Sequence, residues 1–281
     1  SFFGPDPLSL LSVVILTSLG TWGLPQMVQK FYAIDNEDSI KKGTIISTIF
    51  ALVVSGGCYF LGGFGRLFSD KIDIAANGYD SIIPTMLENL HPLLIALVVI
   101  LVLSASMSTL SSLVIASSST LTIDLIKDNI VKEMSDKKQV FCIRVLIVIF
   151  IAISAIIAII QYKSAVTFIA QLMGISWGAL AGSFLAPFLY SLYWKKTTKA
   201  ACWTSFIFGC IIMVLNLVAG SHFPTLLQSP INCGAFAMLA GLIIVPVVSL
   251  FTKKPDTALI ENTFACYDKT NTVTQKTALG K

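Results

Sequence analysis

The run Ser104-Ala105-Ser106-Met107-Ser108-Thr109-Leu110-Ser111-Ser112 lies near the middle of a stretch long enough to cross a bilayer as a helix. From Pro92 to Ile123 the chain has no Asp, Glu, Lys, Arg or His. Ser104, Ser108 and Ser111 are spaced i, i+4, i+7, which places them on one helical face. A hydroxyl without a partner is costly in hydrocarbon, so the cluster predicts that something polar lies against this face. The alternative is that small residues allow close helix packing and each hydroxyl bonds to the carbonyl one turn earlier.

The composition is that of an integral membrane protein. The 281 residues are 55% hydrophobic and 12% charged, and the mean hydropathy is +0.83; soluble domains carry about a quarter charged residues. The net charge of +4 is small and gives no indication of a nucleic-acid partner, so the lipid bilayer is the expected surroundings. The six cysteines form no CxxC pair and no metal-ligand spacing,.

The apolar runs predict an all-α, polytopic membrane protein with seven transmembrane helices. A polar tail follows the last of them and is expected to be loosely ordered. The chain begins with Ser1 and runs almost directly into an apolar stretch, so we expect it to be the C-terminal part of a longer protein. The predicted spans cover about residues 8–34, 43–65, 92–123, 140–161, 165–194, 201–219 and 233–251.

The first span contains residues that favour a break. Gly20 and Gly23 loosen a helix, and Pro25 removes a backbone donor,. We therefore expect the helix to be interrupted near mid-membrane, where a neighbouring polar group would meet the freed backbone. A simple proline kink is the alternative.

Basic residues gather in alternate connections, which predicts the orientation. The connections on one side hold only Arg66, Lys71 and Lys163. By the positive-inside rule Ser1 lies outside and Lys281 lies in the cytoplasm. The connections and tail on the other side hold Lys30, Lys41, Lys42, Lys127, Lys132, Lys137, Lys138, Arg144, Lys195, Lys196, Lys199, Lys253 and Lys254.

Residue types that are absent from the predicted spans limit the chemistry that the chain can perform. No acidic residue and no lysine lies near mid-membrane in any predicted span, whereas a proton-coupled carrier usually needs such a group. The chain has no nucleophile–base pair, HExxH motif or P-loop, so it is not expected to be an enzyme. A sodium ion fits better, because this hard cation accepts neutral carbonyl and hydroxyl ligands. A broken helix and a neighbouring hydroxyl-bearing helix would supply them.

Three runs resemble the sodium:solute symporter family, and most closely its sodium/proline symporter branch: Thr21–Phe31 (TWGLPQMVQKF), Ala105–Ser111 (ASMSTLS) and Ala116–Leu125 (ASSSTLTIDL). The resemblance implies a core of two five-helix inverted repeats with extra helices. Residues 1–195 would form the second repeat, 196–252 two accessory helices and 253–281 a cytoplasmic tail. The N-terminal repeat, absent from this chain, would be its partner in the same protein.

The resemblance also implies a sodium site on the serine-rich span. Carried over position by position, the ligands are the Ala105 carbonyl and the Ser108 and Thr109 hydroxyls. The remaining ligands would come from the missing repeat.

The family's substrate cavity implies a second group of residues. Proline carriers have aromatic residues at the Thr17 and Thr21 positions, so this chain departs from their pattern there. Trp177 has packing or an interfacial position as its alternative. The implied substrate-binding residues are Thr17, Thr21, Trp22 and Pro25 on the first span, with Gln171 and Trp177 on the fifth as weaker candidates.

The sequence therefore predicts a multi-pass transporter of the plasma membrane that couples sodium influx to uptake of a small organic solute. An amino acid such as proline, or an organic acid, is the expected solute class. The alternative is a channel or a sensor-type membrane domain that uses the same fold without coupled transport. A channel would need a continuous polar stripe through several helices, and a sensor would need a signalling domain after Phe251.

Overall fold

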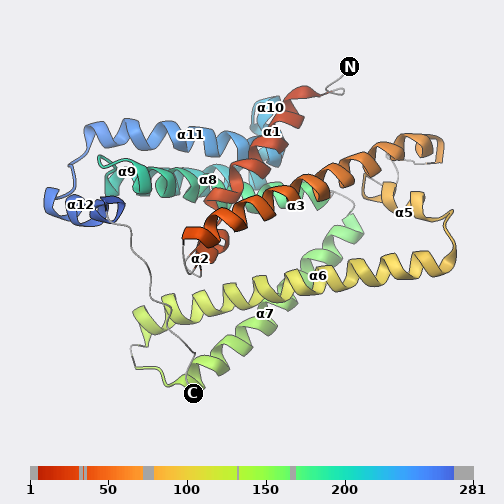
Figure 1. Cartoon of the computed structure of the whole chain (residues 1–281), viewed down its shortest axis with the longest axis horizontal. Coiled ribbons are helices and arrows are strands. Elements are labelled where there is room, and N and C mark those ends of the chain that lie inside the picture. Colours follow the sequence, from red (N-terminus) through yellow and green to blue (C-terminus); the bar gives the residue numbers. More distant parts are fainter. Residues whose placement is uncertain are drawn as a thin grey trace. The chain divides into compact units, whose positions relative to one another are not determined.

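The computed structural model describes residues 6–31, 34, 37–71, 79–131, 133–164 and 169–268. Every regular element within these ranges is helical, and they contain no strand (Figure 1). Six helices are long and apolar enough to cross a membrane. The chain is therefore a multi-pass, all-α membrane protein. These helices are α3 (Glu37–Gly63), α6 (Pro92–Thr120), α7 (Asp136–Ser164), α8 (Ile169–Tyr193), α9 (Lys199–Ala219) and α11 (Pro230–Phe251).

The first predicted span is broken, as its glycines and proline indicate. It consists of α1 (Pro7–Ser18), the 3₁₀ turn η1 (Gly20–Gly23) and α2 (Pro25–Phe31). Leu24 between them is extended, with φ −88° and ψ 114°, because the residue before a proline avoids the helical region. The six long helices correspond to the second to seventh predicted spans within the described residues, and the first span is divided into α1, η1 and α2.

The chain divides into two compact units. The first contains residues 1–57 and 169–281. Within it α8, α9 and α11 lie side by side (Figure 1). The core of these helices has two buried clusters. The first joins α1 to α8 and α11, and the second joins α9 to α8 and α11. The first cluster comprises Leu16, Ala181, Leu185, Ile231 and Met238, and the second Ala186, Ala201 and Val245.

The ends of α8, α9 and α11 are joined by polar contacts. The Thr198 side chain caps α9 by accepting a bond from the Ala201 amide at 3.3 Å. Its oxygen also lies 2.6 Å from that of Thr252, just after α11. At the other end Asn216 donates to the Leu227 carbonyl at 2.7 Å, which holds the connection formed by η5 (Gly220–His222) and α10 (Thr225–Gln228).

The tail after α11 differs from the loosely ordered segment expected. It forms α12 (Thr257–Phe264) and η6 (Ala265–Asp268), with Asp256 capping α12. The Tyr267 hydroxyl donates to the Leu192 carbonyl in the last turn of α8 at 2.9 Å. The polar composition predicted disorder but did not reveal this contact with a helix end, whose last carbonyls lack helical partners. Residues 269–281 lie outside the described part of the chain.

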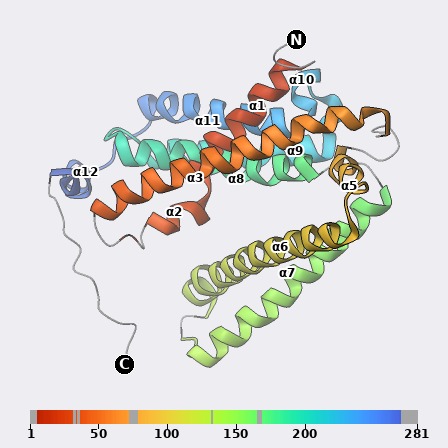
Figure 2. The same ribbon diagram turned by 45° about the vertical axis from the view of Figure 1, so that its right-hand side comes forward.

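The second unit contains residues 58–168. Its main feature is the pair of long helices α6 and α7, which contact each other (Figure 2). The π-helix η4 (Leu121–Ile130) continues α6. In the described part of the connection before α6 lie three short helices: η2 (Phe64–Lys71), η3 (Tyr79–Ser81) and α5 (Ile82–Leu87).

Candidate functional site

The helix α6 carries the hydroxyl cluster of the second unit. It begins at Pro92, which suits a first helical position because its missing amide hydrogen would have no helical partner there,. His91 caps it, since its side chain accepts a bond from the Leu93 amide at 3.3 Å. The 29 residues contain no glycine, no internal proline and no charge. Nothing therefore interrupts the helix where Ser108 and Thr109 lie, near its middle.

The predicted sodium ligands come together at a single carbonyl. The Ser108 hydroxyl donates to the Ala105 carbonyl oxygen at 2.9 Å. The Thr109 hydroxyl donates to the same oxygen at 3.1 Å. Three neutral oxygens thus lie together on an exposed face of α6. The arrangement follows from i, i+3 and i, i+4 spacing, which brings each hydroxyl above the carbonyl one turn earlier.

Three further hydroxyls of this helix, those of Ser111, Ser112 and Ser119, bond in the same local way. Ser111 donates to Met107 and Ser112 to Thr109, each at 2.8 Å. Local bonding was the alternative to a polar ligand, and it is what these hydroxyls do. It leaves their acceptor capacity available, because a hydroxyl has one donor hydrogen and two acceptor lone pairs. Local bonding and ion binding are therefore compatible at Ser108 and Thr109.

The predicted substrate residues of the first span lie at the helix break. Thr17 donates to the Val13 carbonyl at 2.8 Å, and Thr21 donates to the Ser18 carbonyl at 2.9 Å. Trp22 lies in η1 with 57% of its surface exposed. Pro25 begins α2. The break therefore presents two hydroxyls and an indole ring along about two turns of chain.

The two candidates on α8 differ in their surroundings. Trp177 packs against the buried cluster that contains Leu16 and Ile231. This position agrees with the alternative interpretation of Trp177 as a packing residue. Gln171 is half-buried near the beginning of the helix. Both lie in the first unit with the residues of the break, whereas Ala105, Ser108 and Thr109 belong to the second.

The structure adds residues that the sequence did not single out. Ser118 and Thr122 are fully buried, and their hydroxyls have no hydrogen-bond partner in the described ranges. With Val114 they form an i, i+4, i+8 stripe, a signal that was present in the sequence,. Gly23 was already named as a helix-loosening residue, and the structure adds that a Cβ at this position would lie 2.9 Å from the Leu185 Cβ.

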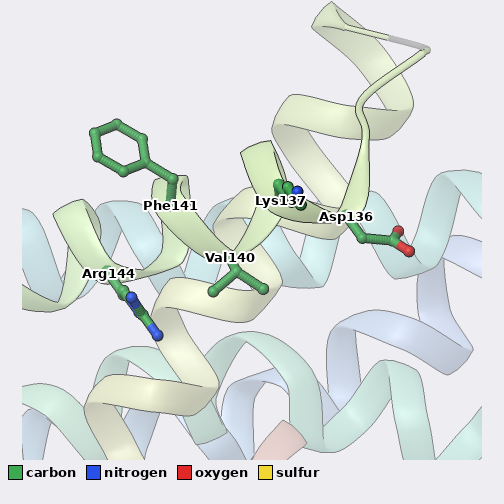
Figure 3. A pocket seen from close by; sticks show the side chains of 5 residues that line it. All are labelled: Asp136, Lys137, Val140, Phe141 and Arg144. Carbon is green, nitrogen blue, oxygen red and sulfur yellow. The ribbon is translucent and has the colours of Figure 1, made fainter.

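A surface depression lies at the beginning of α7. Its lining residues all belong to the first turns of α7, with Phe141 pointing to the other side of the helix from Val140 and Arg144 (Figure 3). None of the predicted site residues lines it. Within the described residues no group of three or more His, Cys, Asp and Glu side chains is placed to hold a metal ion. The depression is lined by Asp136, Lys137, Val140, Phe141 and Arg144.

Comparison with known proteins identifies the family. The sequence model of the sodium:solute symporter family matches residues 4–209, which include every predicted ligand and substrate residue. The chain belongs to the sodium:solute symporter family. The predicted resemblance is thereby confirmed, and the family's name implies sodium as the coupling ion and a small solute as the cargo.

Curated relatives carry transporter names. The osmoregulated proline transporter OpuE of Bacillus subtilis is 26% identical over 90% of this chain and 50% of its own length. The high-affinity proline transporter PutP of the same organism is 27% identical over 92% and 53%. A sodium/proline symporter of Staphylococcus aureus is 28% identical over 88% and 49%. These proteins are named as transporters and not as enzymes.

The chain spans about half the length of the curated relatives it matches. No solved structure matches it.

Proposed function

We propose that this chain forms part of a secondary active transporter that couples sodium influx to uptake of a small organic solute. The observation that carries the proposal is the convergence of the Ser108 and Thr109 hydroxyls on the Ala105 carbonyl, at 2.9 and 3.1 Å, in a charge-free membrane helix. Membership of the family supports it. The names of the relatives favour this function over a channel or sensor domain.

The chemistry of the three oxygens suits sodium. By analogy with other hard cations, an oxygen ligand lies about 2.4 Å from the ion. Ligand oxygens about 3 Å apart then fit adjacent positions around one ion. None of these three oxygens carries a charge, so by themselves they hold the ion weakly and reversibly, as a transporter requires. Further ligands come from the N-terminal repeat that we propose completes the protein.

The helix break provides one wall of the solute site. Its hydroxyls at Thr17 and Thr21 keep acceptor lone pairs, and the Trp22 ring is exposed beside them,. A site with these groups suits a small solute that has both polar and apolar parts. Proline is the first solute to test because the relatives are named proline transporters. An organic acid is the second class.

The transport step couples the two sites. We count the broken first span and the six long helices as seven crossings, of which the first five form the second inverted repeat and the last two are accessory. Sodium at Ser108 and Thr109 stabilises the outward-facing state and orders the solute site. A ligand can shift such an equilibrium only by its difference in affinity between the two states. One helix bundle then rocks against the other in the plasma membrane.

The test uses the full-length protein reconstituted in liposomes with a sodium gradient. Ser108→Ala and Thr109→Ala should each raise the sodium concentration for half-maximal uptake roughly tenfold, as expected when one oxygen ligand is lost. Ser119→Ala is the matched control, because its hydroxyl also bonds locally, to the Ile115 carbonyl at 2.7 Å, but lies beyond the three oxygens.

Two results would contradict the proposal. Unchanged sodium dependence in both variants would exclude the site at Ala105, Ser108 and Thr109. Equal uptake driven by a proton gradient without sodium would exclude sodium coupling. A screen of amino acids and organic acids in the same liposomes identifies the solute.

A further inference from the structure

The break in the first span lies directly against α8. A Cβ placed on Gly23 would lie 2.9 Å from the Leu185 Cβ and 3.0 Å from the Cα atoms of Ala181 and Leu185. Two of these three atoms belong to the α8 backbone, which cannot rotate aside as a long side chain can. Only glycine therefore allows this approach.

We propose that Gly23 is a positioning residue that fixes the helix break onto α8, so that η1 and α8 move as one rigid piece during transport. This inference rests on the proposed function, because it concerns how the solute site moves. Gly23 is buried and has no side chain to offer a solute. It acts through its neighbours Thr21 and Trp22, whose directions are set by where η1 lies.

A second glycine of the same turn gives the contrast. A Cβ on Gly20 would lie 3.6 Å from the Ala181 Cβ and 3.6 Å from the Met238 sulfur, which is ordinary van der Waals contact. Gly20 is therefore near α8 but has room for a methyl group. The tight contact at η1 is specific to Gly23.

The residues on either side of η1 are fixed by burial in the core of the first unit. Leu24, which follows Gly23, is completely buried. Leu16, one turn before the break, is also completely buried and belongs to the cluster with Ala181 and Leu185. The chain is thus anchored on both sides of Thr21 and Trp22, which leaves these two residues little freedom to change direction.

Helix α8 is in turn locked to the two helices after it. A Cβ on Gly178 would lie 2.7 Å from the Gly234 Cα of α11. A Cβ on Gly209 of α9 would lie 2.6 Å from the Gly182 carbonyl carbon and oxygen. Backbone-to-backbone contacts of this kind pack helices closely in membranes. The break, α8, α9 and α11 therefore form one rigid body, in which α9 and α11 support α8 by close packing.

A cross-link tests whether η1 and α8 separate. The Cβ distance of 3.6 Å between positions 20 and 181 suits a disulfide, whose Cβ atoms lie about 3.5–4.5 Å apart. Gly20→Cys with Ala181→Cys is prepared in the full-length protein, with a protease site inserted after Glu133. Fragments that stay joined on a non-reducing gel only in the double variant report the cross-link, and each single variant is a control.

The rigid-body proposal has a definite expected result. Sodium-driven uptake in liposomes should persist in the oxidised double variant at about the level seen after reduction. Loss of uptake on oxidation that returns with reductant would overturn the proposal, since it would mean that η1 and α8 must separate. Absence of the cross-link would overturn the contact itself.

A pair of alanine variants tests Gly23 without a cross-link. Gly23→Ala should raise the solute concentration for half-maximal uptake about tenfold or more, in line with overpacking of a close contact. Uptake is measured per folded transporter, and maximal uptake should change less than half-saturation. Gly20→Ala should stay within about twofold of the parent, since its methyl group fits. Equal behaviour of the two variants would overturn the role of Gly23.

These tests separate the inference from the proposed function. If the parent protein shows no sodium-driven uptake of any solute screened, the proposed function fails. Cross-link formation and the relative thermal stability of Gly23→Ala and Gly20→Ala then still decide whether the contact exists.

Discussion

The hydroxyls of α6 and its continuation fall into two physical classes. Those of Ser108 and Thr109 are exposed and donate to the Ala105 carbonyl, so their hydrogens are satisfied and their lone pairs are available. Those of Ser118 and Thr122 are completely buried and unpaired within the described ranges. Hydroxyls of the first class can serve a ligand, whereas those of the second class cost stability.

The second class leads to a stability prediction. Thr122→Val keeps the branched shape and removes the unpaired hydroxyl, so it should raise the free energy of unfolding by about 1 kcal/mol. Thr120→Val is the control, because Thr120 is exposed and the change should be within about 0.5 kcal/mol,. Thermal unfolding of the full-length protein in detergent measures both. A less stable Thr122→Val protein would show that the hydroxyl has a partner.

The sequence predicts those elements that depend only on residues close together in the chain. The break at η1 follows from Gly20, Gly23 and Pro25, and its extended residue Leu24 follows directly from the proline,. The uninterrupted α6 follows from its lack of charge, glycine and internal proline. The hydrogen bonds of Ser108 and Thr109 follow from their helical spacing to Ala105.

Contacts between distant segments were not predictable in the same way. Tyr267 reaches the Leu192 carbonyl across 75 residues of sequence, and no local pattern indicates that pairing. The tail helix α12 is too short and polar to be recognised from apolar periodicity. The glycines of α8 are visible in the sequence, but the atoms that exclude a side chain at each of them belong to other helices.

The packing of α8 on α11 gives a prediction at the scale of elements. Gly178→Ala would bring a methyl group to 2.7 Å from the Gly234 Cα, so it should cost about 1–3 kcal/mol of stability. Gly43→Ala in α3 is the matched control, because nothing lies within 4 Å of a Cβ there. The control should gain about 0.5–1 kcal/mol through lower backbone entropy of the unfolded chain.

The same thermal unfolding measurement in detergent separates the two glycine variants. A lower melting temperature in Gly178→Ala and an equal or higher one in Gly43→Ala is the expected order. The reverse order would show that α8 and α11 do not pack through their backbones.

At the scale of the molecule, the predicted ligands are divided between the two compact units. Ala105, Ser108 and Thr109 lie in the unit of residues 58–168, and the residues of the helix break lie in the other. A transporter that rocks one bundle against another needs its ion and solute to respond to the same movement.

The orientation of the whole chain gives the last prediction. Basic residues gather in alternate connections. Five lysines lie around the α8–α9 connection and just after α11, whereas the α9–α11 connection has no charged residue. The positive-inside rule therefore predicts that this connection lies outside and the tail lies in the cytoplasm. Two exposed positions report the two sides: Ser221 in the connection and Cys266 in the tail.

A membrane-impermeant maleimide should label Ser221→Cys in intact cells, in a protein without other accessible cysteines. It should label Cys266, as the sole accessible cysteine, only in inside-out vesicles. Labelling of Cys266 in intact cells would reverse the orientation, and with it the side from which sodium enters.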